Sequence, residues 1–552
     1  GPVFAAPRGQ AGGGALNLTA TRGPGLPEAE FAIPAWGLTP GGFRAELDGR
    51  AALDFDLARG LTLQTRGVLA SDRGTLTYSS ADCVATTVAR LELGDNDVTD
   101  ITGDLCPDGR PLVTVANGRW QAGGVLRGMS AEAPFLAMGF TGVAGALTAT
   151  GGPAGIGLDT RIDTARVADT TSPVRFYPVE AGGAARLDDQ NWRGTFDLAR
   201  GGHGLGRLVL AHDGRSGTGG IDITTPELVF AEGGLQPAEL TPLAELLGPP
   251  VTGTARFEGR IDWAADSEGS SSGLLTVPGL DFISPAGPVT GLKGDIAFTS
   301  LTPLVTAPGQ VLTASRLESF APLTDLDLVF GLDAAAITVA GGELVVAGGT
   351  IRIEPFSLPL DRSLPFTGVI VLDQVQLGEI IAGAGFGDRV QMDAVVSGRL
   401  PFVSDPASGI RVTGGSLFAA RPGRLSIQRT ALSDLEAGGG GAVPPGTVED
   451  LAYQAMENLA FDVLTAEVNS LNEGRLSVLF HIKGRHDPPQ KQEIRLTLSQ
   501  LIRRDFLKET LPLPSGTAID LTLDTTLNVN QLVSDLLDLN HARNGGVGPR
   551  QP

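Results

Sequence analysis

Apolar and polar residues alternate with a period of two along most of the chain, and this pattern constrains the fold more than any other feature. In the segment 519–529, apolar residues alternate with Asp, Thr and Asn. Successive side chains of a β-strand point to opposite faces, so such segments are predicted to be strands with one apolar and one polar face. The predicted apolar positions are Leu53, Phe55, Leu57, Leu326, Leu328, Phe330, Leu332, Leu476, Val478, Phe480, Ile482, Ile519, Leu521, Leu523, Leu527 and Val529.

Strands of this kind are typical of antiparallel sheets that face water on one side. The 552 residues include 77 glycines and 37 prolines, and turn pairs such as Asp108-Gly109 and Gly341-Gly342 separate the alternating segments. Aromatic residues make up only 5%, which argues against a deep aromatic core. We therefore predict an all-β fold, a long antiparallel meander without a repeat of fixed length.

A few short helices interrupt the strands. Four segments show helical spacing, namely 237–248, 372–385, 447–460 and 531–539. A helix and a Pro-Pro pair near residue 250 suggest a soft boundary. The predicted divisions are 1–235 as the N-terminal part of the extended sheet, 236–290 as a helix-containing connection, 291–540 as a C-terminal region and 541–552 as a disordered tail.

The formal net charge of -21 argues against two classes of partner. Nucleic-acid recognition needs a basic surface, and so does adhesion to anionic membrane surfaces. We therefore predict no nucleic-acid partner, and a soluble acidic surface accounts for the charge without any function.

The only two cysteines, Cys83 and Cys106, flank a strand-like run and an Asp-rich turn that could return the chain to its start. A disulfide between them is favoured for an exported protein, whereas two buried thiols are the cytosolic alternative. The opening Gly1-Pro2 is typical of a protease scar, so we expect a native signal or N-terminal anchor to have been removed. No apolar run long enough for a transmembrane helix occurs in the sequence.

Candidate chemical motifs all have simpler explanations. His203 and His212 flank a probable strand and are interpreted as surface residues, because their spacing does not converge on one metal ion. The match to G-x-S-x-G at 269–273 lies in a polar linker without the strand-to-helix turn that exposes a nucleophile. Paired carboxylates such as Asp54 and Asp56 alternate with apolar residues and fit a solvated strand face. We predict no catalytic residue, no metal site and no cofactor.

An ordered series of segments resembles the C-terminal region of YdbH-type proteins of Gram-negative bacteria, within the AsmA-like and TamB-like group. Each segment alone is unspecific, and the resemblance rests on their order. The usual Asn-Pro after the Gly484-Arg485 turn is replaced by His486-Asp487-Pro488. The segments are 294–318, 341–360, 369–381, 395–402, 409–427 and 459–487.

This resemblance implies a fold, a location and partners. The fold would be an elongated, curled antiparallel sheet that forms a U-shaped groove of the repeating β-groove type. The protein would be held in the inner membrane by an N-terminal helix, cross the periplasm and carry phospholipids to the outer membrane. A small outer-membrane lipoprotein is the expected partner for the edge strand near 519–529, because an open sheet edge must be paired or covered.

An apolar sheet face independently suits acyl chains, since burial of each CH₂ group contributes about 0.8 kcal/mol without any headgroup recognition. The alternating apolar residues are therefore the candidate lining of a lipid groove. The alternative from another class is a structural spacer of the cell envelope that carries no lipid. A polysaccharide-active enzyme is a third reading, which would require converging carboxylates and aromatic platforms.

Overall fold

The computed structural model describes residues 3–10, 12–23, 27–55, 57–92, 96–153, 155–265, 269–284, 287–319, 321–383, 387–407, 409–428, 448–471, 475–491 and 513–528. Within these ranges the chain forms strands β1 to β35, two short α-helices and three 3₁₀ helices. Paired strands are antiparallel in the described registers, for example β4 with β5 and β33 with β34. The predicted all-β antiparallel class with a few short helices is confirmed.

The chain divides into two compact units. Unit 1 comprises residues 1–247, 253–276 and 296–306, and unit 2 comprises residues 248–252, 277–295 and 307–552. Three strands, β18 (Gly248–Trp263), β19 (Ser270–Ser284) and β20 (Gly287–Leu301), contribute residues to both units. The boundaries expected at 235 and 290 stay a prediction.

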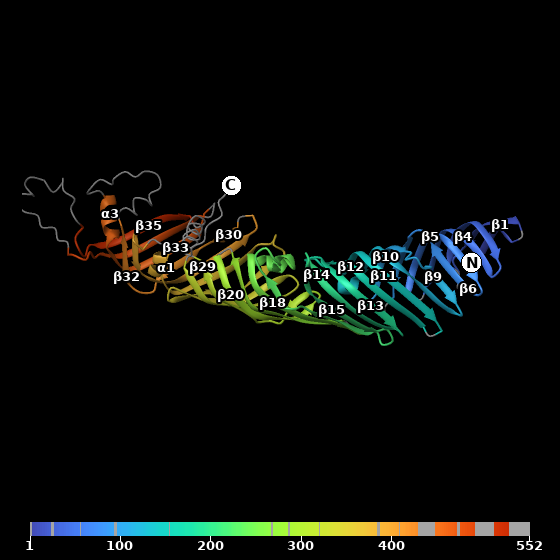
Figure 1. The fold of residues 1–552 in the computed structure, drawn as a ribbon. Helices are drawn as coiled ribbons and strands as arrows, with labels where there is room; N and C mark the ends of the chain where they lie inside the picture. Colours follow the sequence, from blue (N-terminus) through green and yellow to red (C-terminus); the bar gives the residue numbers. More distant parts are fainter. Residues whose placement is uncertain are drawn as a thin grey trace, which may run out of the picture. The chain divides into compact units, whose positions relative to one another are not determined.

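Unit 1 is built from long hairpins whose strands lie side by side, as β10 to β15 do in Figure 1. Its strands, besides the parts of β18 to β20, are β1 (Val3–Gln10), β2 (Gly13–Ala20), β3 (Glu28–Thr39), β4 (Gly42–Phe55), β5 (Ala58–Asp72), β6 (Thr75–Ser80), β7 (Val84–Leu91), β8 (Val98–Cys106), β9 (Val113–Ala116), β10 (Arg119–Ala133), β11 (Met138–Gly152), β12 (Gly155–Asp169), β13 (Val179–Asp188), β14 (Asn191–Arg200), β15 (His203–Asp213), β16 (Thr218–Thr224), β17 (Leu228–Phe230) and β21 (Leu304–Thr306). Its 3₁₀ helices are η1 (Pro134–Leu136), η2 (Pro237–Glu239) and η3 (Pro242–Leu246).

Unit 2 continues the same construction with shorter strands. They are β22 (Gln310–Glu318), β23 (Pro322–Leu332), β24 (Ala336–Val346), β25 (Gly349–Ile353), β26 (Phe356–Pro359), β27 (Phe366–Gln376), β28 (Val390–Asp393), β29 (Val395–Asp405), β30 (Gly409–Val412), β31 (Gly415–Ala419), β32 (Gly423–Ile427), β33 (Leu459–Ser470), β34 (Arg475–His486) and β35 (Ala518–Asn528). The helices are α1 (Leu377–Gly383) and α3 (Val448–Glu457).

Tight two-residue turns explain how these hairpins keep their register. Arg73 and Gly74 both have positive φ between β5 and β6, whose ends pair at Asp72 and Thr75. This conformation is typical of hairpin turns that match the strand twist, and glycine adopts it without steric cost. A register slip of one residue would exchange the two faces, so these turns help to keep apolar side chains together.

The helix predictions are partly wrong. Segment 237–248 forms two 3₁₀ helices, each with a proline at its start, and then enters β18. Among the described residues of segment 372–385, residues 372–376 belong to β27 and residues 377–383 form α1, because strand pairing overrides the helical spacing in the first part. The segment 447–460 contains α3, as predicted. Segments 531–539 and 541–552 lie outside the described residues.

Candidate functional site

The register of unit 2 gathers the predicted apolar residues on one face of neighbouring strands. Directly opposed residues of an antiparallel pair project to the same side. Phe480 lies opposite Leu523, and Ile482 lies opposite Leu521. In the β22–β23 pair, Leu328 lies opposite Leu312.

Exposure differs along this apolar face. Phe330, Leu332, Val478 and Ile482 are buried in the structure. The following residues are half-buried: Leu326, Leu328, Leu476, Phe480, Ile519, Leu521 and Leu523. Half-buried apolar side chains on neighbouring strands leave hydrocarbon surface that a ligand could cover.

The opposite face of the same strands is charged. Asp327, Lys483 and Asp520 are exposed, and the Lys483 ammonium lies 3.1 Å from the Asp520 carboxylate. The two faces therefore differ as the alternation predicts.

The three residues predicted near the start of unit 1 do not form one continuous apolar strand face. Leu53 is half-buried in β4 opposite Leu61. Phe55 is 43% exposed, and its ring meets Trp120 edge to face at 5.5 Å. The expected strand ends at Phe55 after a register shift, so Leu57 lies in the turn before β5.

The last two predicted residues lie at the end of the described part of the chain. Leu527 belongs to β35 and its backbone pairs with Leu476. Val529 lies outside the described residues.

A helix covers part of the apolar face of unit 2. Tyr453 and Met456 of α3 join a buried cluster that contains Leu459, Phe461 and Ile482. Phe461 and Leu459 are each only 1% exposed. We call α3 and this cluster the hydrophobic cap. Asp450 of α3 is also fully buried, and it accepts a hydrogen bond from Gln454 Nε2 at 3.0 Å.

Unit 1 covers part of its apolar face with the 3₁₀ helix η1 at the tip of the β10–β11 hairpin. Leu136 clusters with Ile221 of β16 and Trp263 of β18. The ring of Phe135 meets that of Trp263 edge to face at 5.7 Å. Because β12 to β16 lie between β11 and β18 in the ladder of paired strands, this contact requires the sheet of unit 1 to curl.

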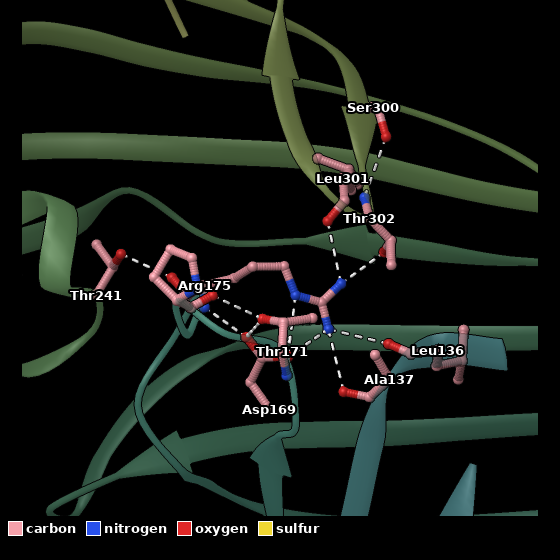
Figure 2. A network of polar contacts seen from close by, with 10 residues as sticks. Leu136, Ala137, Asp169, Thr171, Arg175, Thr241, Ser300, Leu301 and Thr302 are labelled. Atoms are coloured by element: carbon pink, nitrogen blue, oxygen red, sulfur yellow. Dashed lines mark hydrogen bonds and ion pairs between the residues drawn. The ribbon is translucent and has the colours of Figure 1, made fainter. Parts of the chain in front are cut away.

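Arg175, in the loop between β12 and β13, makes hydrogen bonds that hold η1 in this position (Figure 2). Its guanidinium donates hydrogen bonds to the carbonyl oxygens of Leu136 at 2.9 Å and Leu301 at 3.1 Å. It also pairs with Asp169 at 2.7 Å, and the two side chains are 8% and 0% exposed. We call Arg175, Asp169 and the carbonyls of Leu136 and Leu301 the clasp, because they connect η1 to the end of β20.

Other hydrogen bonds hold the clasp in place. The Nη1 atom of Arg175 donates to Oγ1 of Thr302 at 2.5 Å, and the Thr241 hydroxyl donates to the Arg175 carbonyl at 2.7 Å. Thr171 donates its hydroxyl to Asp169 at 2.7 Å. A buried charge is tolerated only when it is paired and hydrogen-bonded, and both charges of the clasp meet that condition.

The pKa of Asp169 reflects two opposing effects. Burial acts to raise the pKa, but hydrogen bonds from Arg175 and Thr171 outweigh it, so the pKa of Asp169 lies below its ordinary value. Asp169 is therefore ionised at neutral pH and forms a true ion pair with Arg175.

His212 corrects one prediction from the sequence. It is buried, not a surface residue, and its Nδ1 accepts a hydrogen bond from Trp263 Nε1 at 3.1 Å. Burial lowers the pKa of His212, which favours the neutral ring that can accept this bond. His203 is exposed, as expected.

Sequence reasoning missed the clasp entirely. Arg175 is a single arginine in a loop, and its partner Leu301 lies 126 residues away. The run Ser172-Pro173 signals a loop, but nothing in the local pattern identifies the hydrogen-bond acceptors.

Cys83 and Cys106 form a disulfide in the structure. It connects the start of β7 to the end of β8, next to the pair Val84 and Leu105. Among the described residues there is no group of His, Cys, Asp and Glu suited to a metal ion. None of the helices in the described ranges is long and apolar enough to span a membrane.

Comparison with protein-family models matches residues 57–500 to the YdbH-like family, described as intermembrane phospholipid transport protein YdbH. The match covers both compact units and extends well before residue 291, where the resemblance in the sequence began. A search of curated proteins finds no match.

Proposed function

The chain belongs to the YdbH-like family of intermembrane phospholipid transport proteins, and from this premise we propose that it carries phospholipids with their acyl chains on the apolar sheet face. The family is a lipid transport family and not an enzyme family. The observation that carries the proposal is the row of half-buried apolar residues that includes Leu328, Phe480 and Leu521. In this proposal the protein works as a bridge between the inner and outer membranes.

Physical chemistry supports a passive mechanism. Burial of each acyl CH₂ group contributes about 0.8 kcal/mol to the binding free energy. On a uniform apolar face this contribution is similar at neighbouring positions. A lipid could therefore stay bound while it moves from strand to strand, with its headgroup in water. This mechanism needs no catalytic residue.

Lipid contact can be tested by photo-crosslinking at matched neighbours. A photoreactive residue in place of Leu521 should crosslink to phospholipid, whereas one in place of Asp520 on the opposite face should not. The same contrast is expected for Leu328 and Asp327. Mass spectrometry of the purified full chain identifies the adducts and any co-purified lipid.

Lipid-free protein with no crosslink at Leu521 or Leu328 would contradict lipid transport and favour a structural spacer. In cells, Leu328→Asp and Leu521→Asp should impair outer-membrane integrity more than Asp327→Leu, because a charge on the apolar face is costly for acyl chains. Equal effects would count against the proposed lipid path.

We also propose that the protein works in the periplasm of a Gram-negative bacterium and is anchored in the inner membrane. A small outer-membrane lipoprotein would pair with β35. Among the described residues β35 is hydrogen-bonded to β34, and an open edge of a sheet is a site to which a partner can add a strand. Crosslinking from Asp524 in intact cells should capture that lipoprotein, whereas crosslinking from Asp327 should not; no capture from Asp524 would contradict the pairing.

A further inference from the structure

A concavity of about 710 Å³ lies on the charged face of unit 1. Residues from five consecutive strands, β11 to β15, line it, and these strands lie side by side in Figure 1. The apolar cluster with Ile221 and Trp263 uses Leu208 and Leu210 of β15. The lining of the concavity contains Val209 and Ala211, which alternate with these two residues, and also Leu210. The three arginines of its lining share the exposed face of Val209 and Ala211, so they lie on the side of the sheet opposite the apolar cluster.

Strand register brings three arginines together there. Arg186 lies opposite Asp159 on one side and opposite Arg193 on the other. Arg161 lies one step along the same face, opposite Ala184. All three arginines line the concavity, with Asp159 as the one acidic residue in its lining.

Two of the three arginines in this concavity have a carboxylate partner, and the third has none among the described residues. Asp159 lies 3.6 Å from Arg186, and Arg161 is paired at 2.9 Å with Asp163, which is outside the lining. Arg193 makes no hydrogen bond or ion pair in the described part of the chain. Arg186 and Arg193 are directly opposed like charges, an arrangement that destabilises a sheet unless an anion lies between them.

This positive site contrasts with the net charge of -21 of the whole chain. Small side chains, Ala146, Ala184 and Ala211, leave space between the arginines. Arg161 and Arg186 are 69% and 67% exposed, so their planar guanidinium groups are accessible to a ligand. Guanidinium groups bind phosphate oxygens in bidentate geometry.

We propose that this concavity binds a phosphate group, held between Arg186 and Arg193 with Arg161 at its edge. The ligand is either a soluble phosphate compound or the headgroup of an anionic lipid, which share this chemistry. The inference goes beyond the proposed function, because it concerns the charged face and requires no acyl chain on the apolar one.

The test uses the purified full chain and two probes. Inorganic phosphate is titrated calorimetrically, and vesicles of phosphatidylcholine with or without phosphatidic acid are tested by co-sedimentation. The variants are Arg186→Gln, Arg193→Gln and the double variant, with Arg44→Gln as the control. Arg44 is also an exposed strand arginine of unit 1, and it does not line the concavity.

We expect at least one probe to bind, with a Kd that rises about tenfold or more in the double variant, as expected for loss of charge-assisted hydrogen bonds. Arg44→Gln should leave that Kd unchanged. Binding of phosphate alone identifies a soluble ligand, and arginine-dependent binding of the phosphatidic acid vesicles identifies a headgroup. No binding of either probe, or equal losses in the double variant and the control, would overturn the proposal. Circular dichroism checks that the variants remain folded.

Discussion

The two compact units cover their amphipathic strands in different ways. In unit 2, α3 places Tyr453 and Met456 over a buried apolar cluster. In unit 1, the short η1 covers Ile221 and Trp263, and the buried pair of Arg175 and Asp169 holds it in place.

The comparison shows that sheets with the same alternating pattern can be covered either by a hydrophobic helix or by a segment that a buried ion pair holds in place. A hydrophobic cap is nondirectional and tolerates changes that preserve volume. A buried ion pair is directional, and removal of one partner leaves an uncompensated charge. Substitutions in the clasp should therefore destabilise unit 1 more than conservative substitutions in the hydrophobic cap destabilise unit 2.

The largest effect is expected for Arg175→Ala. It leaves Asp169 buried without its partner and removes the donors to Leu136 and Leu301, so unit 1 should lose about 3–5 kcal/mol of stability. Hydrogen exchange should show lost protection in β10 to β12, with α3 unchanged. Arg161→Ala, at an exposed ion pair, should have little effect; comparable effects of the two substitutions would show that the clasp does not hold unit 1 together.

Phe461→Ala is the corresponding change in the hydrophobic cap. The lost contacts and the resulting cavity should destabilise unit 2 by about 3–4 kcal/mol. Phe461→Leu should cost much less, because the cap accepts another apolar side chain. Urea denaturation monitored by hydrogen exchange at α3 measures both changes, and equal losses would contradict a tolerant cap.

Acidification should weaken the clasp of unit 1. Because the pKa of Asp169 is lowered in the folded state, its ionised form adds stability above the unfolded value of about 3.9, and this stability is lost as pH falls through the folded pKa. The effect should be smaller than that of Arg175→Ala, since a neutral Asp169 can still accept a hydrogen bond. In Asp169→Asn, the fall in unit 1 stability between pH 5 and pH 2 should be shallower than in the wild type; identical profiles would contradict this role.

The smallest effect is expected for Trp263→Phe. The ring contact with Phe135 can be retained, but His212 loses the hydrogen bond donated to its Nδ1 atom. A loss of about 1 kcal/mol is expected from thermal denaturation. A loss as large as that of Arg175→Ala would mean that the aromatic cluster, and not the clasp, closes unit 1.

The sequence predicted what depends on near neighbours. Alternation around Leu328 and Leu521 indicated both the strands and their apolar faces, because the period of two is a local property of the extended chain. The helical spacing of 372–385 gave a partly wrong prediction for the same reason. Leu372, Val375 and Gln376 pair with β29, and this pairing overrides a local preference.

The sequence by itself therefore determined the all-β antiparallel class, the segregation of apolar and polar faces, and membership of a lipid transport family. Only the tertiary structure decided how each unit covers its apolar face. The clasp depends on Arg175 meeting carbonyl groups of Leu136 and Leu301, and backbone carbonyls are present at every residue. Which of them a buried arginine reaches is set by the curl of the sheet, and no local pattern of side chains encodes that curl.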